Sequence, residues 1–287
     1  MKKIFFLLLI ILSTTHAHAQ EMSIQQSKVV YKTVDNRQLT VDIFSPQNQT
    51  SASQPAIALF HGGGWAFGDP SEFYEACRRY ARKGYVACSF QYRLSIKPDG
   101  SYPHPDISPI EAVKDARSAV RWLKVHADSL GIDPDRIIVG GQSCGGQLAL
   151  STALLDSINE DTDDLTIDPE PAALLLFSGT VNTLEPWVDM LLGDRNREVW
   201  SISPYHNLRE SMPPTIAFHG EEDNQVLPYT VKMFKAKTKK LGNSYDLHWY
   251  PGRKHYLGEG NEKYATYFDE EILALTDEFL EELGLNP

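Results

Sequence analysis

Two hydrophobic patterns alternate along the chain and predict its fold. Short, nearly continuous apolar runs are typical of strands covered on both faces. They fall at residues 56–61, 85–92, 136–140, 172–178, 214–219 and 246–250. Apolar residues at helical spacing lie between and beyond them, at about 71–83, 108–129, 146–157, 228–241 and 264–283. Strands that alternate with helices in this way predict an α/β fold, with a mostly parallel sheet flanked by helices.

The segment before the first of these apolar runs has a different hydrophobic pattern. Residues 28–34 and 39–44 alternate apolar and polar side chains, with Asp35 and Asn36 between them. This predicts an antiparallel hairpin that brings the sheet to eight strands. We find no repeat, and the chain is short enough for a single domain over residues 20–287.

The first nineteen residues have the pattern of an export signal. Lys2 and Lys3 precede nine unbroken apolar residues at 4–12, and Ala17-His18-Ala19 supplies a small-x-small cleavage site. Nine apolar residues are too few to cross a bilayer, which needs about 20 in a helix. We therefore expect a signal peptide over 1–19, cleavage near Ala19, and a periplasmic or secreted product with no stable membrane insertion.

The net charge and the spacing of possible metal ligands limit the kinds of partner that the protein can bind. The chain has 38 acidic and 27 basic residues, a formal net charge of −11, which repels phosphate backbones and argues against nucleic acid. No H-E-x-x-H or Cys/His ligand spacing occurs, so we expect neither a metal nor a cofactor. The acidic stretch 160–164 is expected to be a solvated loop. Cys77 and Cys88 could face one core, either as buried thiols or as a disulfide in an oxidising compartment.

The strongest chemical motif is Gly141-Gln142-Ser143-Cys144-Gly145. It follows the run 136–140 directly and opens a helix, the context in which G-x-S-x-G marks an exposed nucleophile. Such a sharp turn needs small flanking residues, and the helix start directs backbone N–H groups at the reacting centre. We predict Ser143 as the nucleophile and the Cys144 N–H as an oxyanion donor. A nucleophilic Cys144 is the rival, but the glycines are spaced around Ser143.

A glycine-rich loop follows the run 56–61. In His61-Gly62-Gly63-Gly64-Trp65 the missing Cβ atoms let backbone N–H groups approach a ligand closely. Fixed donors of this kind stabilise the oxyanion of a tetrahedral intermediate. We predict Gly63 as the first donor and Gly62 as the second, with His61 orienting the loop.

The acid and the base are expected in two later loops. The run 214–219 leads into Glu221, Glu222 and Asp223, and spacing alone leaves all three open as the acid that orients a histidine. The run 246–250 leads into His255, a placement that suits the general base. A nucleophile, an acid and a base in this order match an α/β-hydrolase sheet.

These motifs resemble the α/β-hydrolase superfamily, in the esterase and lipase branch with an HGGGW loop. The chain looks most like compact carboxylesterases related to bacterial feruloyl and acetyl-xylan esterases and to the hormone-sensitive-lipase group. On that pattern Asp223 is the acid, because it fills the Asp of H-G-x-x-D-x-x-V-x-P, with Glu222 as the fallback. Gln142 and Cys144 depart from the Asp-Ser-Ala of many relatives. The resemblance covers about 28–282, through 61–69, 84–94, 115–147, 219–228 and 250–256.

The resemblance also implies a minimal lid. The first strand begins too early for the N-terminal cap of the hormone-sensitive-lipase group, so any short lid must come from 179–212. Its apolar side chains could line an acyl pocket or simply pack between helices. The candidate pocket residues are Trp65, Gln142, Trp187 and Trp200.

The sequence thus predicts an exported serine hydrolase. We expect it to cleave carboxylic esters of small or short-chain acyl groups through Ser143, Asp223 and His255, on a small-molecule or saccharide-linked substrate. The alternatives are an arylformamidase or other small-amide hydrolase, and a hydrolase-fold protein that only binds a ligand. Non-catalytic members typically lose the nucleophile or the base, and both are present here.

Overall fold

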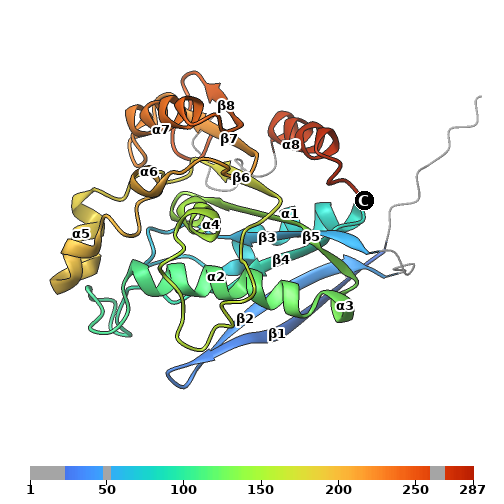
Figure 1. The fold of residues 1–287 in the computed structure, drawn as a ribbon, viewed down its shortest axis with the longest axis horizontal. Coiled ribbons are helices and arrows are strands. Elements are labelled where there is room, and N and C mark those ends of the chain that lie inside the picture. The colour runs from blue at the N-terminus through green and yellow to red at the C-terminus, as the bar shows by residue number, and fades with distance from the viewer. Residues whose placement is uncertain (1–22, 48–52, 259–268) are drawn as a thin grey trace, which may run out of the picture.

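A computed structural model describes residues 23–47, 53–258 and 269–287 (Figure 1), so the predicted signal peptide lies outside the described residues. Its eight-stranded sheet has the order β1-β2-β4-β3-β5-β6-β7-β8. Strand β2 is antiparallel to both neighbours, and the pairs from β4 to β8 are parallel, as the sequence predicts. The strands are β1 (Ile24–Val34), β2 (Arg37–Pro46), β3 (Gln54–Phe60), β4 (Val86–Phe90), β5 (Ile132–Gln142), β6 (Ala173–Phe177), β7 (Thr215–Gly220) and β8 (Tyr245–Tyr250).

The opening hairpin is confirmed, with strands longer than the pattern suggested. Asp35 and Asn36 have φ angles of 49° and 58°. Two positive φ values in a two-residue turn give the backbone twist that matches paired antiparallel strands. Short polar side chains tolerate this conformation, which explains their place between β1 and β2.

Helices cover both faces of the sheet, and alternate strand residues divide the core in two. The described helices are α1 (Tyr74–Arg82), α2 (Pro109–Val125), α3 (Ala127–Leu130), α4 (Cys144–Leu154), α5 (Pro186–Leu192), α6 (Pro204–Asn207), α7 (Pro228–Lys240) and α8 (Glu270–Glu282). Apolar residues of α1 and α8 form one buried cluster with the sheet, and those of α2, α4, α5 and α7 form the other (Figure 1). Helix α4, which follows Ser143, is buried along its whole length.

Several boundaries differ from the sequence pattern. The predicted helix 108–129 is two helices, because the chain leaves helical geometry at His126. The helix predicted from 71 begins with a separate 3-10 turn at Pro70–Phe73, and α4 begins two residues before 146. Segment 179–212, which has no predicted helix, contains α5, a 3-10 turn at Gly193–Glu198, and α6.

Of the two alternatives for Cys77 and Cys88, the structure has two buried thiols, and these do not share one core. Cys77 belongs to the cluster under α1, whereas Cys88 belongs to the cluster on the opposite face. Because side chains alternate along a strand, Ala87 rather than Cys88 faces α1. Both residues, like Cys144, are buried free thiols, and burial raises the pKa of Cys88 to about 12.

The expectation of a solvated loop at 160–164 is also wrong in part. Glu160 lies 2.8 Å from the buried Lys32 ammonium and also pairs with Arg93. Asp163 pairs with Arg121 at 2.8 Å. These ion pairs hold the loop against β1 and α2, and desolvated carboxylates of this kind need such partners.

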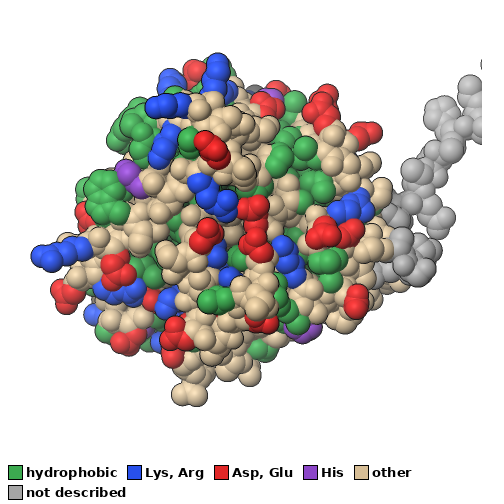
Figure 2. Space-filling view, in the orientation of Figure 1, with side chains coloured by type: hydrophobic (Ala, Val, Ile, Leu, Met, Phe, Trp, Pro, Cys, Tyr) green, Lys and Arg blue, Asp and Glu red, His purple; other side chains and the backbone are tan. Residues whose placement is uncertain are grey.

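Acidic and basic side chains are interspersed on the face shown in Figure 2. Among the described helices, none combines the length and the apolar character needed to span a bilayer.

Candidate active site

The turn between β5 and α4 holds Ser143 in a strained backbone conformation. Its φ and ψ are 55° and −122°, outside the regions that a residue with a Cβ normally occupies. The two flanking positions must be glycine, because neighbouring backbone atoms leave no room for a Cβ. A Cβ on Gly145 would lie 2.0 Å from the Phe60 carbonyl oxygen, and one on Gly141 would lie 2.3 Å from the Gly145 carbonyl. Packing against β3 therefore fixes a turn in which Ser143 is half-buried and its two neighbours are buried.

The loops after β7 and β8 bring an acid and a base together. His255 Nδ1 lies 2.8 Å from Asp223 Oδ2, with both side chains buried. Asp223 Oδ1 accepts hydrogen bonds from the backbone N–H groups of Gln225 at 2.8 Å and Val226 at 3.0 Å. These donors fix a carboxylate that accepts the Nδ1 proton, leaving the Nε2 lone pair for base chemistry.

The competing acids do not reach the base. Glu221 and Glu222 are exposed, whereas Asp223 is buried beside His255. The spacing of the three acids did not decide which one orients the histidine. The direction in which the loop turns points Asp223 at His255 and the two glutamates toward solvent.

His219 braces the acid loop. It is the penultimate residue of β7, and its Nε2–H donates to the Val226 carbonyl at 2.9 Å. The same nitrogen lies 3.4 Å from Asp223 Oδ2. Burial lowers the pKa of His219, and the Asp223 charge partly opposes this. A neutral His219 therefore packs against Asp223 and holds the loop that carries it.

In the glycine loop, the Gly62 carbonyl points away from the pocket, and this directs the Gly63 N–H toward the pocket. The Gly62 carbonyl accepts hydrogen bonds from His61 Nδ1 at 2.7 Å and Tyr92 Oη at 3.3 Å. The C=O and N–H of a trans peptide point in opposite directions, so the Gly63 N–H points away from these two side chains. Gly63 and Cys144 line the same pocket as Ser143 and His255, whereas Gly62 does not. Of the three predicted donors, the pocket lining thus favours Gly63 and Cys144 over Gly62.

Side chains from α4 and α5 hold this loop in place. Trp65 Nε1 donates to Gln147 Oε1 at 3.0 Å, and the Trp65 N–H donates to Cys144 Sγ at 3.3 Å. Trp187 Nε1 donates to the Gly64 carbonyl at 3.0 Å. Burial raises the pKa of the Cys144 thiol. A protonated, buried thiol is a poor nucleophile, which separates Cys144 from Ser143.

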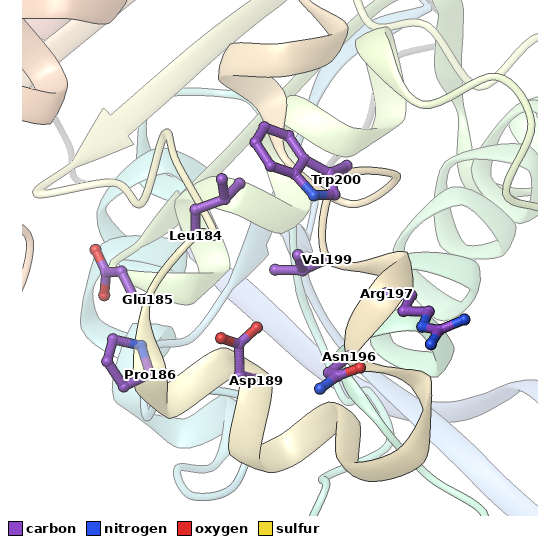
Figure 3. A pocket seen from close by; sticks show the side chains of 8 residues that line it. All are labelled: Leu184, Glu185, Pro186, Asp189, Asn196, Arg197, Val199 and Trp200. Atoms are coloured by element: carbon purple, nitrogen blue, oxygen red, sulfur yellow. The ribbon is translucent and has the colours of Figure 1, made fainter.

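The candidate catalytic pocket, which Ser143 and His255 line, has a volume of about 460 Å³. Trp65, Gln142 and Trp187 line it, as the sequence predicts. Trp200 does not: it lines a neighbouring hollow of about 400 Å³, together with residues that include Asp189 and Val199 (Figure 3). Among the residues that the structure describes, Glu185 alone lines both cavities. Within the described ranges, no three His, Cys, Asp or Glu side chains form a metal-binding group.

The architecture and this site define a class of protein. A nucleophile turn after the central strand β5, an acid and a base after β7 and β8, and a glycine loop after β3 are the arrangement of an α/β-hydrolase. Residues 41–238 match the BD-FAE family. The chain therefore belongs to the BD-FAE family of α/β-hydrolase esterases.

Curated relatives resemble part of this chain. Esterase-5A of Drosophila pseudoobscura pseudoobscura is 34% identical over 151 residues, which cover 52% of this chain and 25% of the relative. Lipase 2 of Moraxella sp. is 36% identical over 124 residues, covering 42% and 27%. The matched part thus spans about a quarter of the length of either relative.

Solved structures resemble nearly the whole chain. Thermogutta terrifontis esterase 2 phosphorylated by paraoxon is 33% identical, with a TM-score of 0.80, covering 91% of this chain and 95% of that one. Its propionate-bound form is 33% identical, with a TM-score of 0.78 and coverage of 93% and 96%. A butyrate-bound form has also been solved.

Proposed function

We propose that this protein is a serine esterase that hydrolyses carboxylic esters of small or short-chain acyl groups. The observation that carries the proposal is the 2.8 Å contact of Asp223 with His255, in one pocket with the strained Ser143. The esterase relatives and the family support it.

The geometry suggests the role of each residue. His255 Nε2 accepts the Ser143 proton while the oxygen attacks the ester carbonyl, and Asp223 stabilises the imidazolium that forms. The Gly63 and Cys144 N–H groups stabilise the oxyanion; one such donor contributes roughly 10²–10³ in kcat. His255 then protonates the departing alkoxide, and water repeats the sequence to release the acid from Ser143.

The wall of the pocket favours a short acyl group. Trp187 is hydrogen-bonded to the oxyanion loop, and the buried indole of Trp65 is hydrogen-bonded to Gln147 of α4. Both indoles take space that a long chain would need. Thermogutta esterase 2 has been solved with propionate and with butyrate. We propose that the substrate is a small-molecule or saccharide-linked ester of this size.

The test is a kinetic series on the mature protein with p-nitrophenyl esters of increasing acyl length. We expect kcat/KM to peak at about two to four carbons and to fall beyond about eight, once added methylenes find no wall to bury against. The p-nitroanilide of the preferred acyl group is the matched control, and should be cleaved far more slowly. Faster anilide cleavage would favour an amide hydrolase, and a preference for triglyceride emulsions would make the protein a true lipase.

We also propose that the protein is exported. The support is the sequence of residues 1–19, with its basic start, apolar run and Ala17-His18-Ala19 site. N-terminal sequencing of the full chain expressed in a bacterium tests this proposal. A periplasmic or secreted product that begins at Gln20 is expected, and an uncleaved cytoplasmic product would refute it.

A further inference from the structure

The side chain of Gln142 lies between the oxyanion loop and the base. It is 2% exposed and lines the catalytic pocket. Its Nε2 is 3.0 Å from His255 Nε2. On the other side, a Cβ placed on Gly62 would lie 1.9 Å from Gln142 Oε1, so the amide rests directly on that glycine. Gln142 therefore fills the space between two parts of the predicted machinery.

The direction of the contact with His255 follows from the acid. Asp223 is an acceptor, so His255 Nδ1 carries the proton of the neutral ring and Nε2 carries a lone pair. Gln142 must then donate an amide N–H to that lone pair. An imidazole nitrogen has a single lone pair, and Ser143 needs it to lose its proton. Among the described residues, His255 Nε2 is hydrogen-bonded to Gln142 and not to Ser143 Oγ.

Other ionisable groups surround His255 without contacting Nε2. Asp223 bonds the opposite nitrogen, and His219 lies behind Asp223. Glu185 lines the pocket near Asp223; burial and the Asp223 charge raise the Glu185 pKa. The Tyr256 ring is 5.2 Å from the His255 ring, edge to face. Gln142 is thus the neutral group in direct contact with the reactive nitrogen.

We propose that Gln142 is a positioning residue that donates to His255 Nε2 in the resting enzyme and releases it before Ser143 is activated. The proposal rests on the proposed function, because it takes His255 as the base. A neutral donor stabilises the neutral ring, and a substrate that displaces the amide frees the lone pair at the moment of attack. The residue before the nucleophile, where many relatives carry Asp, then controls when the base becomes available.

Two variants test the contact from opposite directions. Gln142→Met has a similar length but no N–H, so Ser143 should react about fivefold faster with diethyl p-nitrophenyl phosphate, the factor of one ordinary hydrogen bond. Gln142→Glu places a carboxylate where it stabilises the imidazolium. The acidic limb of the kcat/KM profile should then move about one pH unit upward. Gln225→Glu is the matched control, because Gln225 is exposed and lines the same pocket. The acidic limb of the Gln225→Glu profile should move much less.

A spectroscopic test separates this proposal from the proposed function. In Ser143→Ala, the Nε2 nitrogen of His255 can be followed by ¹⁵N NMR without any turnover. Adding Gln142→Met should move that resonance downfield, because the lone pair loses its donor. An unchanged ¹⁵N resonance would overturn the positioning role. So would an acidic limb of the kcat/KM profile that moves no further in Gln142→Glu than in Gln225→Glu. An inactive parent enzyme with the expected resonance change would instead refute the esterase and leave the contact standing.

Discussion

The turn that carries Ser143 and the segment 179–212 contribute to one pocket, yet they are built differently. The turn lies between the buried strand β5 and the buried helix α4, and backbone atoms of β3 fill the space next to its glycines. The segment is a chain of short helices with many exposed side chains, joined to the rest by buried apolar side chains such as Val188 and Leu191 and by hydrogen bonds such as Trp187 to Gly64. Backbone packing determines the first region, and individual side chains determine the second.

This difference indicates where the protein tolerates change. A residue fixed by surrounding backbone has one available position, so changes there act on the chemical step. A wall of side chains on short helices can be altered without moving Ser143 or His255. We therefore expect substitutions near the turn to change kcat by orders of magnitude, and substitutions in 179–212 to change substrate preference by smaller factors.

The largest effect is expected from the nucleophile. Ser143→Ala should lower kcat by about 10⁵–10⁶ while binding and the oxyanion donors remain. Ser143→Gly should be equally inactive but about 1 kcal/mol more stable than Ser143→Ala, because glycine tolerates the positive φ. Ester hydrolysis and urea unfolding midpoints measure the two effects. Activity above a few per cent in purified Ser143→Ala would exclude this residue as the nucleophile.

The next effect concerns the acid. Asp223→Asn should lower kcat by about 10⁴, because an amide in that position favours the wrong imidazole tautomer. Glu222→Gln, an exposed neighbour with the same chemical change, should keep activity within about twofold. Steady-state kinetics at one saturating ester concentration distinguish them. Loss of activity in Glu222→Gln alone would transfer the role to Glu222.

The sheet could be predicted from the sequence because its strands are covered on both faces and have continuous apolar runs. The Ser143 turn could be predicted because its glycines are required by contacts that recur wherever a strand turns sharply into a helix. Asp223 was separable from Glu221 and Glu222 only by family pattern. The structure adds the physical reason, which is the pair of backbone donors from Gln225 and Val226.

What the sequence could not give depends on side-chain direction and distant partners. Helices as short as α5 and α6 do not establish a helical period. Cys88 faces away from α1 because of strand register. Glu160 is half-buried because β1 supplies Lys32 from a remote part of the chain. The bracing role of His219 depends on a carbonyl in the following loop, for which no motif exists.

The last prediction compares two tryptophans of the same segment. Trp187 lines the catalytic pocket and Trp200, 54% exposed, lines the hollow beside it. Trp187→Ala should raise kcat/KM for an eight-carbon ester relative to a four-carbon ester by about tenfold, since each newly buried methylene contributes about 0.8 kcal/mol. Trp200→Ala should leave that ratio within about twofold. Because Trp187 also donates to Gly64, Trp187→Phe separates the two roles: it loses the hydrogen bond but keeps a ring. A uniform loss of activity on all esters in both Trp187 variants, with no change of preference, would mean that this indole supports the oxyanion loop and does not set acyl length.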